Sequence, residues 1–155
     1  GKKQLQYILP KDVEIVRRTF EGIDDNKPVF TKEEMNNQIN LHALRAQHAR
    51  DSYFFYLEKI QQNPKMRQAL SQLLISKWEE WHQNLKKESP NKYEIRRKTF
   101  IYDLRDELYI LRGTNKSKAL ASGMPIIYNR LALMAVSVLN LSHWRLSVTV
   151  TNYIL

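Results

Sequence analysis

The sequence predicts an all-α protein, a compact bundle of five or six helices around one long central helix at about residues 31–62, in a single domain of residues 1–155. The central helix is indicated by a capping box, in which the Thr31 hydroxyl and the Glu34 carboxylate can each satisfy a backbone N–H of the first turn. The segment contains no glycine and no proline before Pro64. A helix of roughly 45 Å is therefore expected.

Apolar side chains on this segment fall on two faces, which is typical of a helix packed between neighbours. The first face follows three- and four-residue steps and comprises Met35, Ile39, His42, Ala46, Ala49, Tyr53, Leu57 and Ile60. The second face comprises Leu41, Leu44, His48 and Phe55. The segment is therefore expected to be the central strut of the bundle.

Proline, glycine and asparagine delimit the helices on either side of this strut. A short helix is expected at 10–21, with Gly22 as its C-cap. Asn63 and Pro64 end the central helix and begin a third helix, which runs to about Glu88.

The rest of the chain is expected to contain two further helices and a variable tail. Asn91 caps a fourth helix that ends at Gly113, and residues 113–118 lack apolar side chains and are expected to form a mobile loop. Residues 126–141 are apolar nearly all round, which indicates a helix in the core or in an oligomer interface. Residues 144–151 alternate as in a short C-terminal β-strand, and a helical continuation of the preceding element is the alternative.

The net charge of +9 is unevenly distributed along the chain. Residues 1–62 carry 10 basic and 9 acidic side chains, or +1, whereas residues 63–155 carry 15 and 7, or +8. Such asymmetry indicates a polyanionic partner, with nucleic acid first and an acidic membrane surface second.

Composition narrows the class of protein. A hydrophobic content of 43% excludes wholesale disorder. The absence of cysteine excludes a disulfide framework and cysteine-ligated zinc, and it fits a cytoplasmic or nuclear protein. The start of the chain has no apolar signal region, and the apolar run at 131–139 is too short for a membrane span. A soluble intracellular protein is therefore expected.

Motifs for catalysis or metal binding are missing from the sequence. It has no glycine-rich phosphate loop, no His-Glu-x-x-His and no nucleophile elbow. His42 and His48 lie on opposite faces of the predicted central helix, so they cannot share a metal ion. We therefore predict no enzyme, no catalytic residue, no cofactor and no metal site.

Cations and aromatic residues alternate on the predicted fourth helix. Lys98, Arg105 and Arg112 are each seven residues apart, and Tyr102 and Tyr109 form a second line behind them. Interleaved cations and rings suit a phosphate backbone with stackable bases. The predicted nucleic-acid-binding residues are Lys86, Lys87, Lys92, Arg96, Arg97, Lys98, Tyr102, Arg105, Tyr109, Arg112, Lys116 and Lys118.

Two further considerations bear on this face. Arg96 and Arg97 place cations in the first turn, where the helix dipole favours anions, which indicates a role other than helix stability. The structural alternative is that Tyr102, Tyr109 and Ile95 pack against another helix instead of facing water.

A second nucleic-acid hypothesis divides the central stretch. If the chain breaks near Asn40, residues 31–39 and 41–60 become the two helices of a helix-turn-helix. The side chains that would then read bases are His42, Arg45, Gln47 and Arg50. The turn glycine often found in this motif is missing, and the helical spacing continues through Asn40.

The sequence thus predicts a non-enzymatic nucleic-acid-binding protein, for RNA or DNA, that acts mainly through backbone charge contacts with some aromatic stacking. The alternative is a protein–protein adaptor or regulatory helical bundle. It would homodimerise through its apolar C-terminal third, since closed two-fold dimers are the commonest oligomers.

Overall fold

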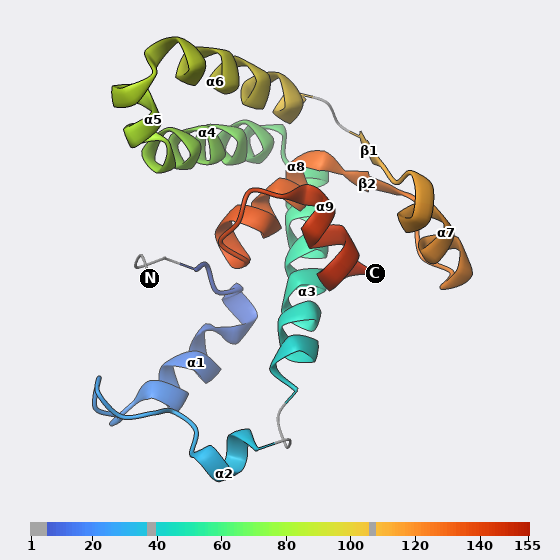
Figure 1. The fold of residues 1–155 in the computed structure, drawn as a ribbon. Coiled ribbons are helices and arrows are strands. Elements are labelled where there is room, and N and C mark those ends of the chain that lie inside the picture. Colours follow the sequence, from blue (N-terminus) through green and yellow to red (C-terminus); the bar gives the residue numbers. More distant parts are fainter. Residues whose placement is uncertain (1–5, 37–39, 106–107) are drawn as a thin grey trace.

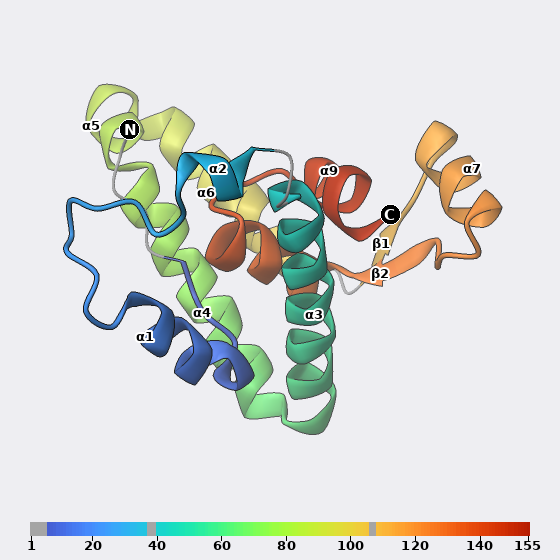
Figure 2. The same cartoon turned by 90° about the horizontal axis from the view of Figure 1, so that it is seen from below.

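Helix α3 (Leu41–Gln62) runs through the middle of the molecule, and the other elements are arranged around it (Figure 1). The structure is a computed structural model, and it describes residues 6–36, 40–105 and 108–155. Helices α4 (Pro64–Trp81), α5 (Gln83–Glu88) and α6 (Pro90–Arg105) lie on one side of α3. Strands β1 (Leu108–Ile110) and β2 (Ile127–Asn129) and helix α7 (Gly113–Ala121) project on the other side (Figures 1 and 2). The predicted mostly helical bundle is confirmed, and its two-stranded sheet lies at Leu108–Ile110 and Ile127–Asn129 and not at the C-terminus.

The predicted central helix is divided at its N-terminal end. The Thr31 capping box is present, with Glu34 N donating to Thr31 Oγ1 at 3.2 Å and Thr31 N donating to Glu34 Oε2 at 2.7 Å. It begins only the single turn α2 (Lys32–Met35). Helix α3 starts with its own cap, because Asn40 Oδ1 accepts from Ala43 N at 2.9 Å. An asparagine side chain that binds backbone N–H groups competes with helix continuation, so the start predicted at residue 31 is corrected to 41.

The two predicted faces of α3 are only partly buried. Ala46, Ala49, Tyr53 and Ile60 lie in the core as predicted. The exposed members of the two faces are Met35, Leu41, His42 and Leu44. Ile39 lies outside the described residues. Tyr153 of the C-terminal helical turn contacts this end of α3, with its ring centroid 5.5 Å from that of His42, and Leu41, His42 and Leu44 remain exposed beside it.

The N-terminal segment forms a strap across the bundle. A short 3-10 turn at Pro10–Asp12 leads into helix α1 (Val13–Phe20), whose C-cap is Glu21, one residue before the predicted Gly22. Gly22 has φ +77°, the left-handed conformation that glycine adopts without strain. Tyr7 N donates to Leu139 O at 2.9 Å, and Tyr7 O accepts from Asn140 Nδ2 at 3.0 Å. These bonds attach the strap, whereas α1 itself buries no residue.

The predicted third helix is two helices, α4 (Pro64–Trp81) and α5 (Gln83–Glu88). Asn63 caps α4 as predicted, with its Oδ1 accepting from Lys65 N at 3.0 Å. The break is at His82, whose ring stacks on Trp78 at a centroid distance of 3.9 Å. His82 Nδ1 also lies 2.8 Å from Trp78 O. This side-chain bond takes up a carbonyl at the end of α4, which allows the chain to turn into α5.

The predicted fourth helix ends early. Helix α6 spans Pro90–Arg105, and the chain then forms strand β1 (Leu108–Ile110). Strand β1 pairs antiparallel with β2 (Ile127–Asn129), with Tyr109 opposite Tyr128. The helix predicted to reach Gly113 is wrong, because the strand pairing takes the backbone hydrogen bonds of this segment.

Residues predicted as a mobile loop form helix α7 (Gly113–Ala121) instead. Ala119 is fully buried in the core cluster, and its carbonyl accepts from Met124 N at 2.8 Å. The prediction of a loop at 113–118 therefore failed, because a buried alanine and its cap anchor a helix whose first six residues lack apolar side chains.

The last third is helical after β2. Helix α8 (Arg130–Ala135) continues into a π-helical turn at Val136–Asn140, and α9 (Leu146–Thr149) continues into another at Val150–Ile154. The strand predicted for residues 144–151 is wrong. The segment is helical from Leu146, as in the alternative, but it does not continue the preceding element, because residues 141–145 are not helical. Thr149 is buried, where its hydroxyl bonds to Ser137 Oγ and Arg145 O. Packing thus overrides the β-propensity of this segment.

The apolar run at 126–141 is covered by its own chain from Leu131 onward, whereas Ile127 is 49% exposed. Helix α8 contacts α3, α4, α6 and α9, and Leu131, Leu133 and Met134 are buried in the core cluster. The apolar side chains on all sides of this helix are thus explained by burial inside one chain. This packing gives no support to their use as a dimer surface. Among the residues that the structure describes, no helix has the length and apolar content required to cross a membrane.

Candidate nucleic-acid interface

Helix α6 is fixed by an aromatic contact with α4, which determines the face it presents outward. Tyr93, Phe100 and Leu104 are buried on its inner side. Trp78 of α4 packs against Tyr93 and Phe100, with ring centroids 5.4 and 5.7 Å apart. Since residues follow one another at 100° around a helix, the opposite face of α6 is directed to solvent.

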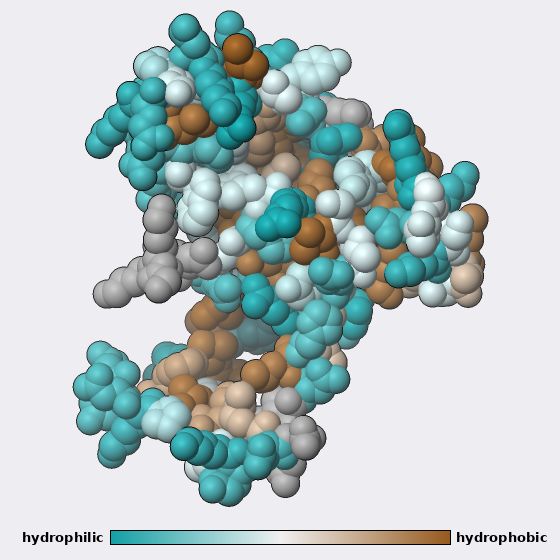
Figure 3. Space-filling model, in the orientation of Figure 1, coloured by the Kyte–Doolittle hydropathy of each residue, from teal (hydrophilic) through white to brown (hydrophobic). Residues whose placement is uncertain are grey.

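Two large side chains lie on that outer face without cover. Tyr102 is 72% exposed and Ile95 is 67% exposed. They are seven residues apart and so lie close together on the helix surface. Figure 3 shows a largely hydrophilic surface over α5 and α6 with isolated hydrophobic residues in it. The alternative in which Tyr102 and Ile95 pack against another helix is therefore wrong for these two residues.

Cations flank Tyr102 and Ile95 on both sides of the outer face. Lys98 and Arg105 lie on one flank and Lys92 on the other, as their helical positions require, and all three are exposed. Arg96 follows on the Lys92 side and is also exposed. Helix α6 carries five basic against two acidic side chains. We call Lys92, Ile95, Lys98, Tyr102 and Arg105 the α6 outer face.

Helix α5 adds two cations beside α6. Lys86 and Lys87 are both exposed. The Lys86 ammonium lies 5.5 Å from the centre of the Tyr93 ring, a cation–π distance. The predicted residues from Lys86 to Arg105, with the exception of Arg97, are thus exposed on two helices that contact each other, α5 and α6.

Arg97 is turned inward and has a structural partner. Its Nε donates to Glu79 Oε1 of α4 at 2.5 Å, and both side chains are about one-third exposed. This hydrogen bond to Glu79 raises the pKa of Arg97, which stays charged. The ion pair joins α6 to α4, so Arg97 is not available to a ligand in this conformation.

The dipole argument for Arg96 and Arg97 does not hold. Helix α6 begins at Pro90, so these residues lie in its second turn. The effect of the helix dipole falls off within the first turn. The ion pair with Glu79 is the structural reason for Arg97.

The remaining predicted residues lie elsewhere. Tyr109 is in β1, half-buried, with the Arg130 guanidinium 5.6 Å from its ring centre. Arg112 precedes α7, and Lys116 and Lys118 lie on it. Helices α6 and α7 are well separated in both views (Figures 1 and 2). The predicted lines Lys98–Arg105–Arg112 and Tyr102–Tyr109 are therefore wrong, because the helix ends at Arg105.

The helix-turn-helix hypothesis placed the break correctly at Asn40, but its reading residues are engaged by the chain itself. Arg45 Nη2 donates to Leu141 O at 3.0 Å, and Arg50 Nη1 to Tyr153 O at 3.4 Å. Gln47 Nε2 donates to Asp51 Oδ1 at 2.7 Å. These bonds hold the side chains against the C-terminal segment and along α3.

A metal site is the other feature that the sequence analysis considered. The part of the chain that the structure describes contains no group of three or more histidine, aspartate or glutamate side chains placed to hold a metal ion. Burial, reinforced by Arg45 and Arg145, lowers the pKa of His143, which is therefore neutral at pH 7.

The exposure of Ile95 could not be predicted from the sequence, because helical spacing alone cannot show which face of α6 meets α4.

Comparisons with protein-family models, with curated proteins and with solved structures find no match to this chain.

The two tyrosines are expected to respond differently to truncation. Tyr102→Ala should weaken single-strand binding by roughly 1–3 kcal/mol if a base stacks on the ring, with an unchanged melting temperature. Tyr109→Ala should instead lower the free energy of unfolding by about 1–2 kcal/mol and leave affinity unchanged, because its half-buried ring packs under Arg130. Fluorescence anisotropy and thermal melting on both variants measure this.

Tyr102→Phe is the matched control for stacking, because it keeps the ring and removes only the hydroxyl. It should bind as the unmodified protein does. A Tyr102→Ala variant that melts early but binds normally would refute the stacking role.

Proposed function

We propose that the protein is a non-enzymatic nucleic-acid-binding protein whose α6 outer face binds a single strand of RNA or DNA. The observation that carries the proposal is the exposure of Tyr102 and Ile95 between cations on a rigidly held helix. Phosphates would contact Lys92, Lys98 and Arg105, and a base would stack on the Tyr102 ring.

Charge and rigidity favour this use of the surface. The cations of α5 and α6 lie in the part of the chain that carries +8. Helix α6 is held by the Trp78 contacts and by the Arg97–Glu79 ion pair, so its outer face is formed before a ligand arrives. A preformed surface loses less conformational entropy when a ligand binds to it. A flexible ligand strand can then adjust to the fixed cations.

The salt dependence of binding tests the proposal. Six exposed cations on α5 and α6, namely Lys86, Lys87, Lys92, Arg96, Lys98 and Arg105, are available to phosphates. With a slope of about −0.7 per contact for single strands, affinity should fall roughly 300-fold between 50 and 200 mM salt. Anisotropy titrations of a labelled oligonucleotide at several salt concentrations measure the slope. Binding that is absent at low salt, or independent of salt, would refute the proposal.

A protein-interaction module is the second candidate function. The exposed apolar surface that favours it lies in the N-terminal third of the chain, and not in the apolar C-terminal third. Ile15, Phe20 and Leu44 are all more than half exposed. Figure 3 shows hydrophobic residues gathered over α1. Residues 6–36 carry five basic and seven acidic side chains, so two copies of a basic protein could meet here without strong repulsion. Light scattering at micromolar concentrations should then show a dimer, and one 18.5 kDa species would reject this candidate.

A further inference from the structure

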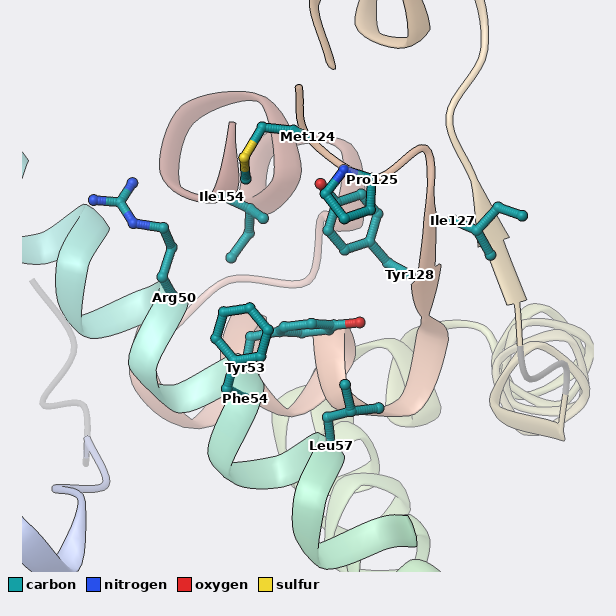
Figure 4. Close-up of a pocket in the computed structure, with 9 residues that line it drawn as sticks. All are labelled: Arg50, Tyr53, Phe54, Leu57, Met124, Pro125, Ile127, Tyr128 and Ile154. Atoms are coloured by element: carbon teal, nitrogen blue, oxygen red, sulfur yellow. The ribbon is translucent and has the colours of Figure 1, made fainter. Parts of the chain in front are cut away.

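The two-stranded ribbon of β1 and β2 has one edge against the bundle. Asn129 N of β2 donates to the Tyr53 hydroxyl of α3 at 2.9 Å, and Figure 4 shows this hydroxyl pointing toward β2. Strand β2 also contacts α8. The β2 edge of the ribbon is therefore bonded to its own chain.

The outer edge of β1 is open by contrast. Leu111 N donates to Ile126 O across the ribbon at 2.9 Å, and neighbouring residues of an antiparallel strand direct their backbone groups to opposite sides. Ile110 therefore directs its N–H and C=O to the outer edge. The sheet has no third strand among the described residues, and β1 lies farther from α3 than β2 does in Figure 1. Leu108 O accepts from Arg130 Nη2 at 3.4 Å, so Ile110 is the position at which a further strand can pair.

One face of the ribbon is apolar and exposed. Tyr109 and Tyr128 are paired with each other and lie on the inner face, so their neighbours lie on the outer face. Figure 4 shows Ile127 and Tyr128 on opposite sides of β2. The outer face comprises Leu108 (50% exposed), Ile110 (50%) and Ile127 (49%). Because a ribbon of two strands is only marginally stable in water, a third strand beside β1 would stabilise it and extend this apolar face.

The charge that follows the open edge is positive. Residues 108–155 contain five basic side chains and no acidic side chain. Asp106 and Glu107 precede β1 and lie outside the described residues. The exposed cations that follow β1 are Arg112, Lys116 and Lys118. A partner with negative charge at this end of β1 is therefore complementary to it.

The open edge favours a peptide over the other partners that cations attract. In a membrane, the N–H and C=O of Ile110 would lose water without gaining a hydrogen bond. Nucleic-acid bases stack on aromatic rings, whereas the exposed side chains here are aliphatic and the Arg130 guanidinium already lies over the Tyr109 ring. A second copy of the chain would bring the same cations to the edge and be repelled.

We propose that the outer edge of β1 binds an extended acidic segment of a partner protein as a third, antiparallel strand. Its backbone would exchange two hydrogen bonds with Ile110, and an apolar side chain opposite Ile110 would also contact Leu108. Since antiparallel strands run in opposite directions, the acidic residues belong at the N-terminal end of the segment, near Arg112. The proposal is independent of nucleic-acid binding at the α6 outer face.

A synthetic peptide of glutamates followed by alternating valine and threonine is the probe, and the same peptide with lysines in place of the glutamates is its control. In an NMR titration of the ¹⁵N-labelled full chain, the glutamate peptide should shift the amide signals of residues 108–112 saturably. It should also slow hydrogen exchange of the Ile110 amide roughly tenfold or more. The lysine peptide should bind at least roughly tenfold more weakly. Equal binding of the two peptides, or no saturable shift with glutamate peptide at up to about 1 mM, would overturn the proposal.

Backbone pairing is tested separately from charge. Ile110→Pro removes the N–H at the outer edge but no bond between β1 and β2, and strand edges tolerate proline. It should weaken peptide binding roughly tenfold, whereas Ile110→Val should bind as the unmodified protein does. If the proline variant does not fold, a glutamate peptide N-methylated at its valines removes the same hydrogen bonds from the ligand side and should lose binding equally. Unchanged binding in this test would show that no strand pairs at Ile110.

The cations and the competing partners are tested last. Replacing Arg112, Lys116 and Lys118 together by Gln should weaken peptide binding roughly tenfold, because each exposed ion pair contributes little. The matched control replaces Lys86, Lys87 and Lys92 by Gln, which removes the same charge from α5 and the start of α6 and should cost less than roughly threefold. Equal losses would overturn the proposal. Vesicles of phosphatidylcholine and phosphatidylserine, or a single-stranded oligonucleotide, that shift residues 108–112 when the peptide does not would also overturn it.

Discussion

Replacing Lys92, Lys98 and Arg105 together by Gln is expected to weaken single-strand binding roughly a hundredfold at 0.1 M salt. The three cations flank Tyr102 and Ile95 on the α6 outer face and are exposed. Each phosphate contact to a single strand contributes about 0.7 to the slope of log affinity against log salt, so the triple variant should also lose roughly two units of slope. Anisotropy titrations over a range of salt concentrations give both values.

The fold should not change in this variant. Substitutions of exposed residues usually alter the free energy of unfolding by no more than about 0.5 kcal/mol. Thermal melting should therefore superimpose on that of the unmodified protein.

The chain offers a matched control with the same change in net charge. Replacing Arg112, Lys116 and Lys118 by Gln also removes three cations, but from the region of α7, away from α6 (Figure 1). This variant should lose less than roughly tenfold, because only long-range attraction is reduced. Equal losses from the two triple variants would show that net charge, and not the α6 outer face, determines binding.

Leu133→Ala is expected to destabilise the protein by about 2.7–5 kcal/mol, the range for leucine truncations in a packed core. Leu133 is fully buried in α8, which α3, α4, α6 and α9 surround. For a chain of this length the melting temperature should fall by roughly 5–20 °C. Chemical denaturation and thermal melting measure the loss.

The same variant tests where the apolar residues of the last third are buried. If a single chain buries these apolar residues, the melting temperatures of the unmodified protein and of Leu133→Ala should not depend on protein concentration. Leu120→Ala is the control, because Leu120 is an exposed leucine of α7 and its truncation should cost little. A melting temperature that rises with concentration and a Leu133→Ala variant that only dissociates would restore the dimer interpretation.

Local signals predicted several helix boundaries, although not the start of α3. The Thr31–Glu34 box, the Asn63–Pro64 start of α4 and the left-handed Gly22 just after α1 are all present. Each depends on a side chain and backbone groups within four residues of it, so the sequence contains the whole interaction. The ends of long helices were predicted poorly. Asn40 and His82 interrupt them through side-chain bonds that periodicity does not reveal.

The candidate site was predicted in part. Charge asymmetry and the cations of α5 and α6 follow from the sequence, and Lys98, Tyr102 and Arg105 do share an exposed face. The extension to Tyr109 and Arg112 failed, because strand β1 pairs with β2, 16 or more residues further along the chain. A heptad pattern cannot show that a distant strand will end the helix.

The sequence by itself determined the helical class, the capped start of α4 at Asn63 and Pro64, and the concentration of positive charge in residues 63–155, because these depend on composition and near neighbours. Only the tertiary structure decided which faces are buried. The Trp78 contacts orient α6 so that Tyr102 is outside, and the packing of α3, α4 and α6 around α8 encloses Leu133. Burial is a property of pairs of surfaces far apart in the chain, and their free energy of contact selects one face among several that the pattern allows.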